Sequence, residues 1–393
     1  MPYNFDKIID RKQTNCVKHD AVSRFFGAEN LLPLWVADMD FETPDFIQNA
    51  MQKRLDHPVN GYTYFSDEFY TSFINWMEKR HQFAVEKSWL EVTPGVLTGL
   101  SLAIMAFTKP GEKIIIQPPV YHPFLQLVES SDRVVLENDL LFEDGGYKMD
   151  FDGLEASIDS QTKMIIISNP HNPVGRVWTK EELTHLVEIC EKHQIIILAD
   201  EIHSDIIFKP NTYTPIASIS EYAKHNSLSF IAPSKTFNIA GLSTSFVIIP
   251  NEDKHKVFSA ITSRFHVSGA SVFGSVACEA AYTHGEEWLE QLLVYLKSNI
   301  EIVKSYFSKH LPAVRVIEPE GTYLLWLDFS RLKLADEKLH EILIEDAKVA
   351  LNKGISFGAN GENFMRLNVG SPQSIIVEGL ERIVAAFKRQ EDF

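Results

Sequence analysis

One lysine in this sequence is placed for covalent chemistry. Lys235 follows the apolar run SFIAPS at 229–234, and together with Ser234 it lies in small, uncharged surroundings. A lysine held in such a place has a lowered pKa, and its neutral amine can form a Schiff base with a carbonyl carbon. The alternative is an ordinary surface lysine in a turn. The strand-end position makes Lys235 a candidate nucleophile.

Two further polar residues come at strand ends. Asp200 ends the buried run IIILAD, where an ionised carboxylate is costly unless it meets a cation. A protonated pyridine nitrogen would be such a cation, and a structural salt bridge or a helix cap is the alternative. In SNPHNPVGR, Asn172 lies at the same sheet edge and could donate to a phenolate oxygen, although Asn before Pro also makes turns.

A glycine turn and a tyrosine complete the set of candidate residues. VTPGVLTGLSLAIMAF places the amides of Gly95, Val96 and Leu97 at the positive start of a predicted helix, where they could bind phosphate. A Pro-Gly helix start can equally be structural. Tyr121, in PPVYHPF, would lie at the carboxyl edge of a parallel sheet and could stack on a flat cofactor, or it could simply pack.

The elements that must position these residues are short, unbroken apolar runs, which are typical of strands covered on both faces of a mostly parallel sheet. The runs are 113–117, 163–168, 195–200, 229–234 and 245–250. Between two of them lies TKEELTHLVEICEKH, in which Thr179 and Glu182 form a capping-box pattern. This order predicts a βαβ unit.

The pattern changes after Gly285, where leucines and other apolar residues at helical spacing predict a long helix that ends near Pro312. Strand-like and helical stretches then alternate, as in a small α/β domain. We therefore expect a large domain at 46–284 and a small domain at 285–393, to which the N-terminal segment 1–45 contributes. The expected fold is α/β, with a mostly parallel central sheet, helices on both of its faces, and a smaller α/β domain.

The composition restricts the class of partner. The chain has 393 residues and a formal net charge of −16, so most of its surface would repel nucleic acid. Its three cysteines form no Cys-x-x-Cys pair and indicate neither a disulfide framework nor a zinc site. The first residues contain charges throughout and no run approaches the length of a membrane span, so we expect a cytoplasmic protein with no membrane partner.

The motifs NPHNPVG, DEIHSD and PSKTFN, in this order and spacing, resemble the class I/II aminotransferase family of fold-type I pyridoxal-phosphate (PLP) enzymes. The resemblance covers nearly the whole chain. It is greatest to the cystathionine β-lyase or cysteine C–S lyase branch, whose pattern includes PLWVADMDF at 33–41, GYTYF at 61–65, PPVYHPF and a late RLNVGSP.

The resemblance implies a role for each candidate residue and a homodimer. Lys235 would form the Schiff base and Asp200 would pair with the pyridine nitrogen of PLP. The other implied roles are Asn172 and His203 at the phenolate oxygen, Tyr121 stacked on the ring, Gly95, Val96, Leu97 and Ser234 at the phosphate, Arg366 and Ala37 at the substrate, and Tyr62 reaching in from the second subunit.

Two departures from ordinary aminotransferases favour the lyase branch. His203 stands where those enzymes usually have a tyrosine, and Ser243 stands where they often have an arginine on the phosphate. His203 could otherwise be a packed, hydrogen-bonded histidine. We expect release of a thiol, pyruvate and ammonia from cystathionine or a related cysteine S-conjugate. The alternatives are an amino-acid aminotransferase, and a regulatory protein that keeps the pocket for binding; a dehydrogenase is disfavoured because no Gly-x-Gly-x-x-Gly follows the early strands.

Overall fold

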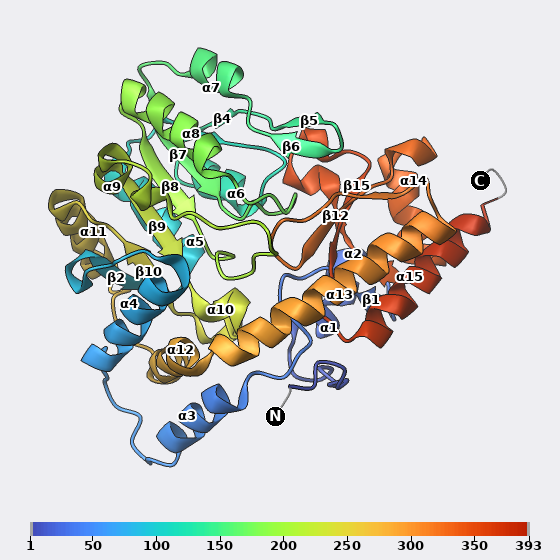
Figure 1. Cartoon of the computed structure of the whole chain (residues 1–393), viewed down its shortest axis with the longest axis horizontal. Coiled ribbons are helices and arrows are strands. Elements are labelled where there is room, and N and C mark those ends of the chain that lie inside the picture. Colours follow the sequence, from blue (N-terminus) through green and yellow to red (C-terminus); the bar gives the residue numbers. More distant parts are fainter. Residues whose placement is uncertain (1–2, 391–393) are drawn as a thin grey trace.

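A seven-stranded sheet forms the centre of the protein in the computed structural model, which describes residues 3–390 (Figure 1). Its strands, in spatial order, are β2 (Leu90–Thr93), β10 (Ser245–Ile248), β9 (Ser227–Ile231), β8 (Ile196–Asp200), β7 (Thr162–Ser168), β3 (Lys113–Ile116) and β4 (Val134–Glu137). Strand β10 pairs antiparallel with both neighbours, and the remaining pairs are parallel. The prediction of a mostly parallel sheet is confirmed.

Helices cover both faces of this sheet, which explains why its strands are apolar without alternation. In β7, Ile165 and Ile167 belong to one buried cluster and Met164 and Ile166 to another. The first cluster includes residues of α7 (Phe151–Ser157), α8 (Lys180–His193) and α9 (Glu221–Asn226). The second includes residues of α5 (Val96–Phe107), α6 (Pro123–Glu129) and α11 (Glu252–Arg264). Successive side chains therefore enter two separate cores.

The predicted crossover helix begins as its sequence indicates. Thr179 is the N-cap of α8, its side chain accepts from the Glu182 backbone, and the Glu182 side chain accepts from the Thr179 backbone. This reciprocal pair satisfies two amide groups that the helix itself leaves free. The βαβ unit of β7, α8 and β8 is confirmed, and it brings the ends of both strands to one edge of the sheet.

A long helix, α13 (Glu286–His310), leads to a smaller antiparallel sheet of four strands. These strands, in spatial order, are β11 (Arg315–Val316), β12 (Leu324–Asp328), β15 (Phe364–Asn368) and β14 (Asn352–Lys353). Helices α14 (Asp336–Glu341) and α15 (Gln373–Lys388) belong to the same region (Figure 1). Among residues 3–390, no helix is both long and apolar enough to cross a membrane.

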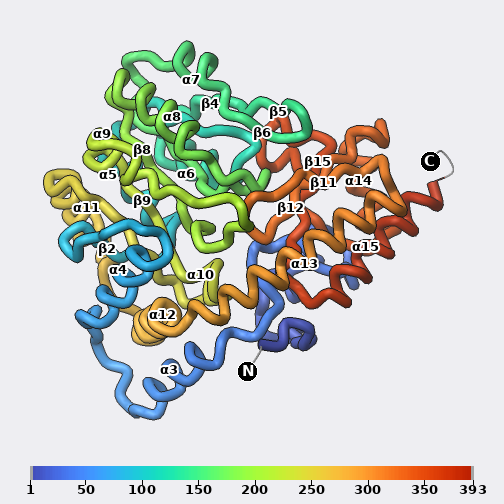
Figure 2. The backbone as a smooth tube through the Cα atoms, in the orientation of Figure 1, coloured from blue at the N-terminus to red at the C-terminus, as the bar shows by residue number. Residues whose placement is uncertain are grey.

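The N-terminal segment joins the C-terminal region rather than the large sheet (Figure 2). Its short helices α1 (Val17–Asp20) and α2 (Val22–Phe26) precede β1 (Leu32–Pro33), which pairs parallel with β13 (Val349–Ala350). Helices α3 (Asp45–Leu55), α4 (Asp67–His81) and α12 (Val272–His284) then pack together. The exact division into domains stays a prediction.

Candidate active site

Lys235 lies in the short helix α10 (Pro233–Thr236), immediately after β9. Its Nζ donates a hydrogen bond to the Ala37 carbonyl oxygen at 2.7 Å. Burial lowers the pKa of Lys235, and the Asp38 carboxylate is the main influence in the opposite direction. Within residues 3–390 no carboxylate lies within ion-pair distance of Nζ. The surroundings therefore favour a neutral, reactive amine.

Asp200 is a buried carboxyl at the end of β8. Burial raises its pKa to about 7, and the nearby Lys235 charge only partly opposes this rise. Its carboxylate accepts from the Ile202 backbone at 3.2 Å, and no cation of the described residues pairs with it. A buried carboxylate without a cation is unfavourable. Asp200 thus fits a protonated ring nitrogen, and the structural salt bridge is absent from the part of the chain described.

Arg366 is a buried guanidinium on β15. Its Nη1 donates to Asn172 Oδ1 at 2.9 Å, and its Nη2 donates to the Trp35 carbonyl at 3.1 Å and to Asn352 Oδ1 at 2.8 Å. Its Nε has no hydrogen-bond partner, and burial lowers its pKa to about 10. All the acceptors that it has are neutral. Across residues 3–390 Arg366 makes no ion pair, so it can bind an external carboxylate.

Asn172 and Tyr121 lie in the same electrostatic surroundings as Arg366. Because Asn172 Oδ1 accepts from Arg366, its Nδ2 is the group left to donate, as a partner of a phenolate oxygen must. Burial raises the pKa of Tyr121, while the charge of Arg366 lowers it and that of Asp200 raises it. The carboxyl edge of the sheet therefore brings these residues together.

His203 is buried beside the same residues. Burial lowers its pKa to about 3, and the positive charges of Lys235 and Arg366 act in the same direction, so the imidazole is neutral. Its ring contacts Tyr323 edge-on with 5.8 Å between centroids, and its Nδ1 has no hydrogen-bond partner among the described residues. The packing interpretation accounts for the ring contact, and the free Nδ1 leaves a polar atom for a ligand.

The predicted phosphate site lies at the starts of two helices. Gly95 is the N-cap of α5, with φ at 143°, and a Cβ built there would meet no atom within 4 Å. Open space therefore lies next to the first amides of α5, including those of Val96 and Leu97, which have no partner within the helix. Ser234 is near the start of α10. Because one strand separates β2 and β9, the axes of these two strands lie about 10 Å apart, and the helix starts follow them at the same edge of the sheet.

Tyr62 does not join this cluster within the chain. It lies in the 57–66 loop between α3 and α4, and its side chain is fully exposed. Tyr64 and Val59 in the same loop are also largely exposed. The structure therefore brings together the candidate residues of the sheet edge, and it leaves Tyr62 outside.

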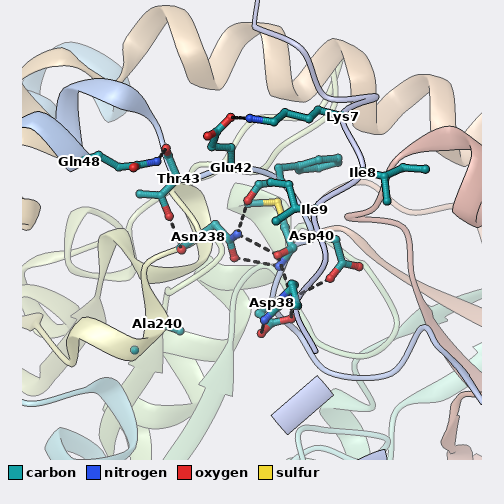
Figure 3. A pocket seen from close by; sticks show the side chains of 14 residues that line it. Lys7, Ile8, Ile9, Asp38, Asp40, Glu42, Thr43, Gln48, Asn238 and Ala240 are labelled. Atoms are coloured by element: carbon teal, nitrogen blue, oxygen red, sulfur yellow. Dashed lines mark hydrogen bonds and ion pairs between the residues drawn. The ribbon is translucent and has the colours of Figure 1, made fainter. Parts of the chain in front are cut away.

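The sequence reasoning missed how closely residues 36–41, which we name the strap, are held. Asn368 Nδ2 donates to the Val36 and Asp38 carbonyls, at 2.5 and 2.6 Å. Asn238, three residues after the candidate lysine, donates to the Met39 and Phe41 carbonyls at 2.8 and 2.9 Å and accepts from the Met39 amide (Figure 3). The strap thus joins the loop of Lys235 to the strand of Arg366.

Ion pairs hold the carboxylates of the strap. Asp40 is buried and receives Lys18 Nζ and Arg11 Nη1, each at 2.7 Å. Arg11 also pairs with Asp38 at 2.7 Å. A cavity of about 620 Å³ opens beside these residues (Figure 3). The motifs PLWVADMDF, PSKTFN and RLNVGSP contain most of these residues, but their polar character alone did not indicate which backbone groups they bind.

Known proteins resemble the chain over nearly its whole length. The family model of aminotransferase class I and II matches residues 29–383. Cystathionine β-lyase PatB of Bacillus subtilis (strain 168) is 42% identical, over 98% of this chain and 99% of that protein. A PLP-bound protein of Clostridium difficile 630, provisionally named an aminotransferase, is 44% identical with a TM-score of 0.96, covering 98% of this chain and 99% of that one. The PLP-bound C–S lyase of Staphylococcus hominis is 32% identical with a TM-score of 0.90, covering 99% and 100%. The chain therefore belongs to the class I and II aminotransferase family.

Proposed function

We propose that this protein is a PLP-dependent carbon–sulfur β-lyase, acting on cystathionine or a related cysteine S-conjugate. Elimination and hydrolysis would release a thiol, pyruvate and ammonia, and the thiol from cystathionine is homocysteine. The observation that carries the proposal is the buried Arg366 guanidinium, which has no ion pair among the described residues and shares its electrostatic surroundings with Lys235. An amino-acid carboxylate would satisfy it.

The residues of the sheet edge fit PLP by their donor chemistry. When bound, PLP supplies an electron sink for the electron pair left at the substrate α-carbon. Asp200 would hold a proton on the ring nitrogen, because a cation beside it relieves the cost of burying its carboxylate. Asn172 Nδ2 would donate to the phenolate oxygen, and Tyr121 would stack on the ring. Gly95, Val96, Leu97 and Ser234 would hold the phosphate.

Lys235 moves the proton in this proposal. Its lowered pKa favours the neutral amine, which can accept the substrate α-proton at Nζ. Arg366 holds the carboxylate through parallel guanidinium donors and so fixes the direction of the α-hydrogen. The electron pair can then expel a thiolate from the β-carbon, and a proton delivered to that sulfur gives the free thiol.

The second candidate is an amino-acid aminotransferase, which the name of the matching family model favours. The two reactions share removal of the α-proton and diverge after it, because transamination returns the proton to a carbon of the cofactor. His203 supports the lyase reaction, since a neutral histidine replaces the phenol donor that ordinary aminotransferases carry there. The curated cystathionine β-lyase at 42% identity also supports the lyase.

We further propose a cytoplasmic homodimer in which Tyr62 reaches the cofactor of the partner subunit. The exposed aromatic side chains of the 57–66 loop support this assembly, because neighbouring apolar side chains exposed to water are typical of a protein–protein interface. The cytoplasmic location is supported by three cysteines that are all unpaired in the structure.

The test is a pair of incubations with the PLP-loaded protein. The first contains cystathionine alone and is assayed for pyruvate and free thiol. The second contains an amino donor and a keto acid and is assayed for the new amino acid. The lyase proposal expects sustained turnover in the first and slow turnover in the second. Sustained turnover in the second alone would establish the aminotransferase.

A further inference from the structure

Two hydrogen-bond donors bind one backbone oxygen in the candidate active site. Lys235 Nζ donates to the Ala37 carbonyl at 2.7 Å, and the Tyr323 hydroxyl donates to the same oxygen at 2.9 Å. We propose that Tyr323 is a positioning residue, which orients the Ala37 carbonyl to receive the Lys235 amine whenever a substrate amine displaces it from the cofactor. This inference rests on the proposed function.

Tyr323 is itself fixed for this role. It lies immediately before β12 with 1% of its surface exposed, and its carbonyl accepts from the Val369 amide at 2.9 Å. Burial raises the pKa of its hydroxyl, which therefore remains a donor. A carbonyl oxygen has two lone pairs. When the Tyr323 hydroxyl binds one lone pair of the Ala37 oxygen, it fixes the orientation of this peptide group, and the second lone pair points to Lys235.

The neighbouring carbonyls of the strap are already engaged. Asn368 donates to the oxygens of Val36 and Asp38, on either side of Ala37. These bonds come from the interior of the small sheet, where Asn368 is fully buried. The Ala37 oxygen is therefore the acceptor in this stretch to which the Lys235 amine donates. The bonds from Asn368 to the two flanking carbonyls fix the position of the Ala37 peptide group.

The displacement step defines when this acceptor is needed. The substrate nitrogen forms a bond to the cofactor carbon while the bond from that carbon to Lys235 Nζ breaks. One proton passes from the substrate nitrogen to Nζ, so Lys235 leaves as a neutral amine with two hydrogens. A hydrogen-bond acceptor at 2.7 Å stabilises this released amine, and it stabilises the ammonium that forms after α-proton transfer even more.

The proposed role predicts different effects on two kinds of ligand. The Tyr323 hydroxyl favours only states in which Lys235 is free, so its removal should weaken ligands that displace the lysine. Ligands that bind Arg366 through a carboxylate without displacing Lys235 should keep their affinity. A general packing role for Tyr323 would affect both kinds of ligand alike.

The experiment measures ligand binding to the PLP-loaded Tyr323→Phe protein by visible absorbance. 2-Aminoisobutyrate has an amine and a carboxylate but no α-hydrogen, so it displaces Lys235 and stops there. Propionate has only the carboxylate. We expect the apparent Kd of 2-aminoisobutyrate to rise about fivefold, as for one lost hydrogen bond, while that of propionate stays within about twofold.

The matched control is Tyr222→Phe. Tyr222 lies in α9, and its hydroxyl also donates to backbone carbonyls, those of Cys190 and Ile195, at 3.0 and 2.9 Å. It should leave both affinities unchanged. If Tyr323→Phe fails to hold PLP, Asn368→Ser removes the bonds to the Val36 and Asp38 carbonyls that flank Ala37, and it should show the same selectivity.

Equal weakening of both ligands, or no weakening of 2-aminoisobutyrate, would overturn the positioning role of Tyr323. Failure of the PLP chemistry itself would look different, because the unmutated protein would then show no change of visible absorbance with 2-aminoisobutyrate. Failure of the lyase reaction alone would appear as no pyruvate from cystathionine, with the 2-aminoisobutyrate and propionate comparison unaffected.

Discussion

The strap at 36–41 and the loop at 57–66 both carry residues of the candidate active site, but they are built in opposite ways. The strap is bound by side chains from the N-terminal segment, the loop after Lys235 and the small sheet. In the 57–66 loop, Tyr62 and Tyr64 project into solvent. One part of the site is complete within a single chain, whereas in the proposed homodimer the other part would be completed by a second subunit.

Hydrogen-bond accounting explains the difference. Four consecutive carbonyls of the strap, from Val36 to Met39, accept bonds from side chains, which satisfies them away from water and fixes their directions. The 57–66 loop instead exposes the aromatic side chains of Tyr62 and Tyr64, and its Val59 carbonyl accepts from Arg54 at 3.0 Å. We therefore expect the strap to hold its groups in position within one chain, and the loop to contribute to the site only when a second subunit is present.

The largest effect should follow Lys235→Ala. Loss of the amine that moves the α-proton should reduce kcat by at least about 10³-fold, measured as pyruvate formation from cystathionine. The melting temperature should not fall, because the substitution removes a lowered-pKa amine from buried surroundings. Lys338→Ala, at an exposed position of α14, is the control and should retain full activity. Retention of turnover by Lys235→Ala would remove this residue from the mechanism.

The next effect should follow Arg366→Lys. Lysine keeps the charge but loses the parallel donors, at a cost on the order of 2–4 kcal/mol in transition-state binding. The loss should appear in kcat/KM for cystathionine, and PLP affinity should change little. Wild-type kcat/KM would show that the carboxylate is held elsewhere.

Tyr62→Phe tests the other side of the comparison. We expect kcat to fall about tenfold, as for loss of one positioned polar group at a reacting centre, with an unchanged melting temperature. Tyr64→Phe is the control from the same loop and should have a smaller effect. Sedimentation at micromolar concentration should show a dimer for both. A fully active monomer would contradict the proposed role of the loop.

The smallest effect concerns the pH dependence of stability in the cofactor-free protein. Burial raises the pKa of Asp200 to about 7, so the folded chain binds a proton that the unfolded chain loses near pH 4. The free energy of unfolding should therefore fall as pH rises from 5 to 7. In Asp200→Asn the free energy of unfolding should fall by about 2 kcal/mol less over this pH range. The remaining fall comes from Glu201, whose pKa is also raised to about 7. Denaturation at both pH values measures the difference, and an identical fall in both proteins would contradict it.

Much of the fold could be predicted because its signals are local. The strand runs, the capping box at Thr179 and the long helix after Gly285 depend on residues close in sequence. The candidate residues at strand ends could be predicted for the same reason, since parallel strands bring their carboxyl ends to one edge.

The strap could not be predicted, because its contacts join residues far apart in the chain. Asn238 contacts Met39 across 199 positions, and Asn368 contacts Val36 across 332. Polar side chains that bind backbone groups leave no periodic pattern in a sequence. The partner of Asn172 was missed for this reason too, because Arg366 lies 194 positions away on another sheet.

The central claim is that this site eliminates a thiol instead of transferring an amino group, and one measurement tests it most directly. The PLP-loaded protein is incubated with cystathionine and no keto acid, and pyruvate, homocysteine and the visible absorbance of the cofactor are followed in the same sample. The account predicts equal amounts of pyruvate and homocysteine, formed in many turnovers while the absorbance persists. Absorbance lost after a single turnover, with no pyruvate and recovery only when a keto acid is added, would contradict it.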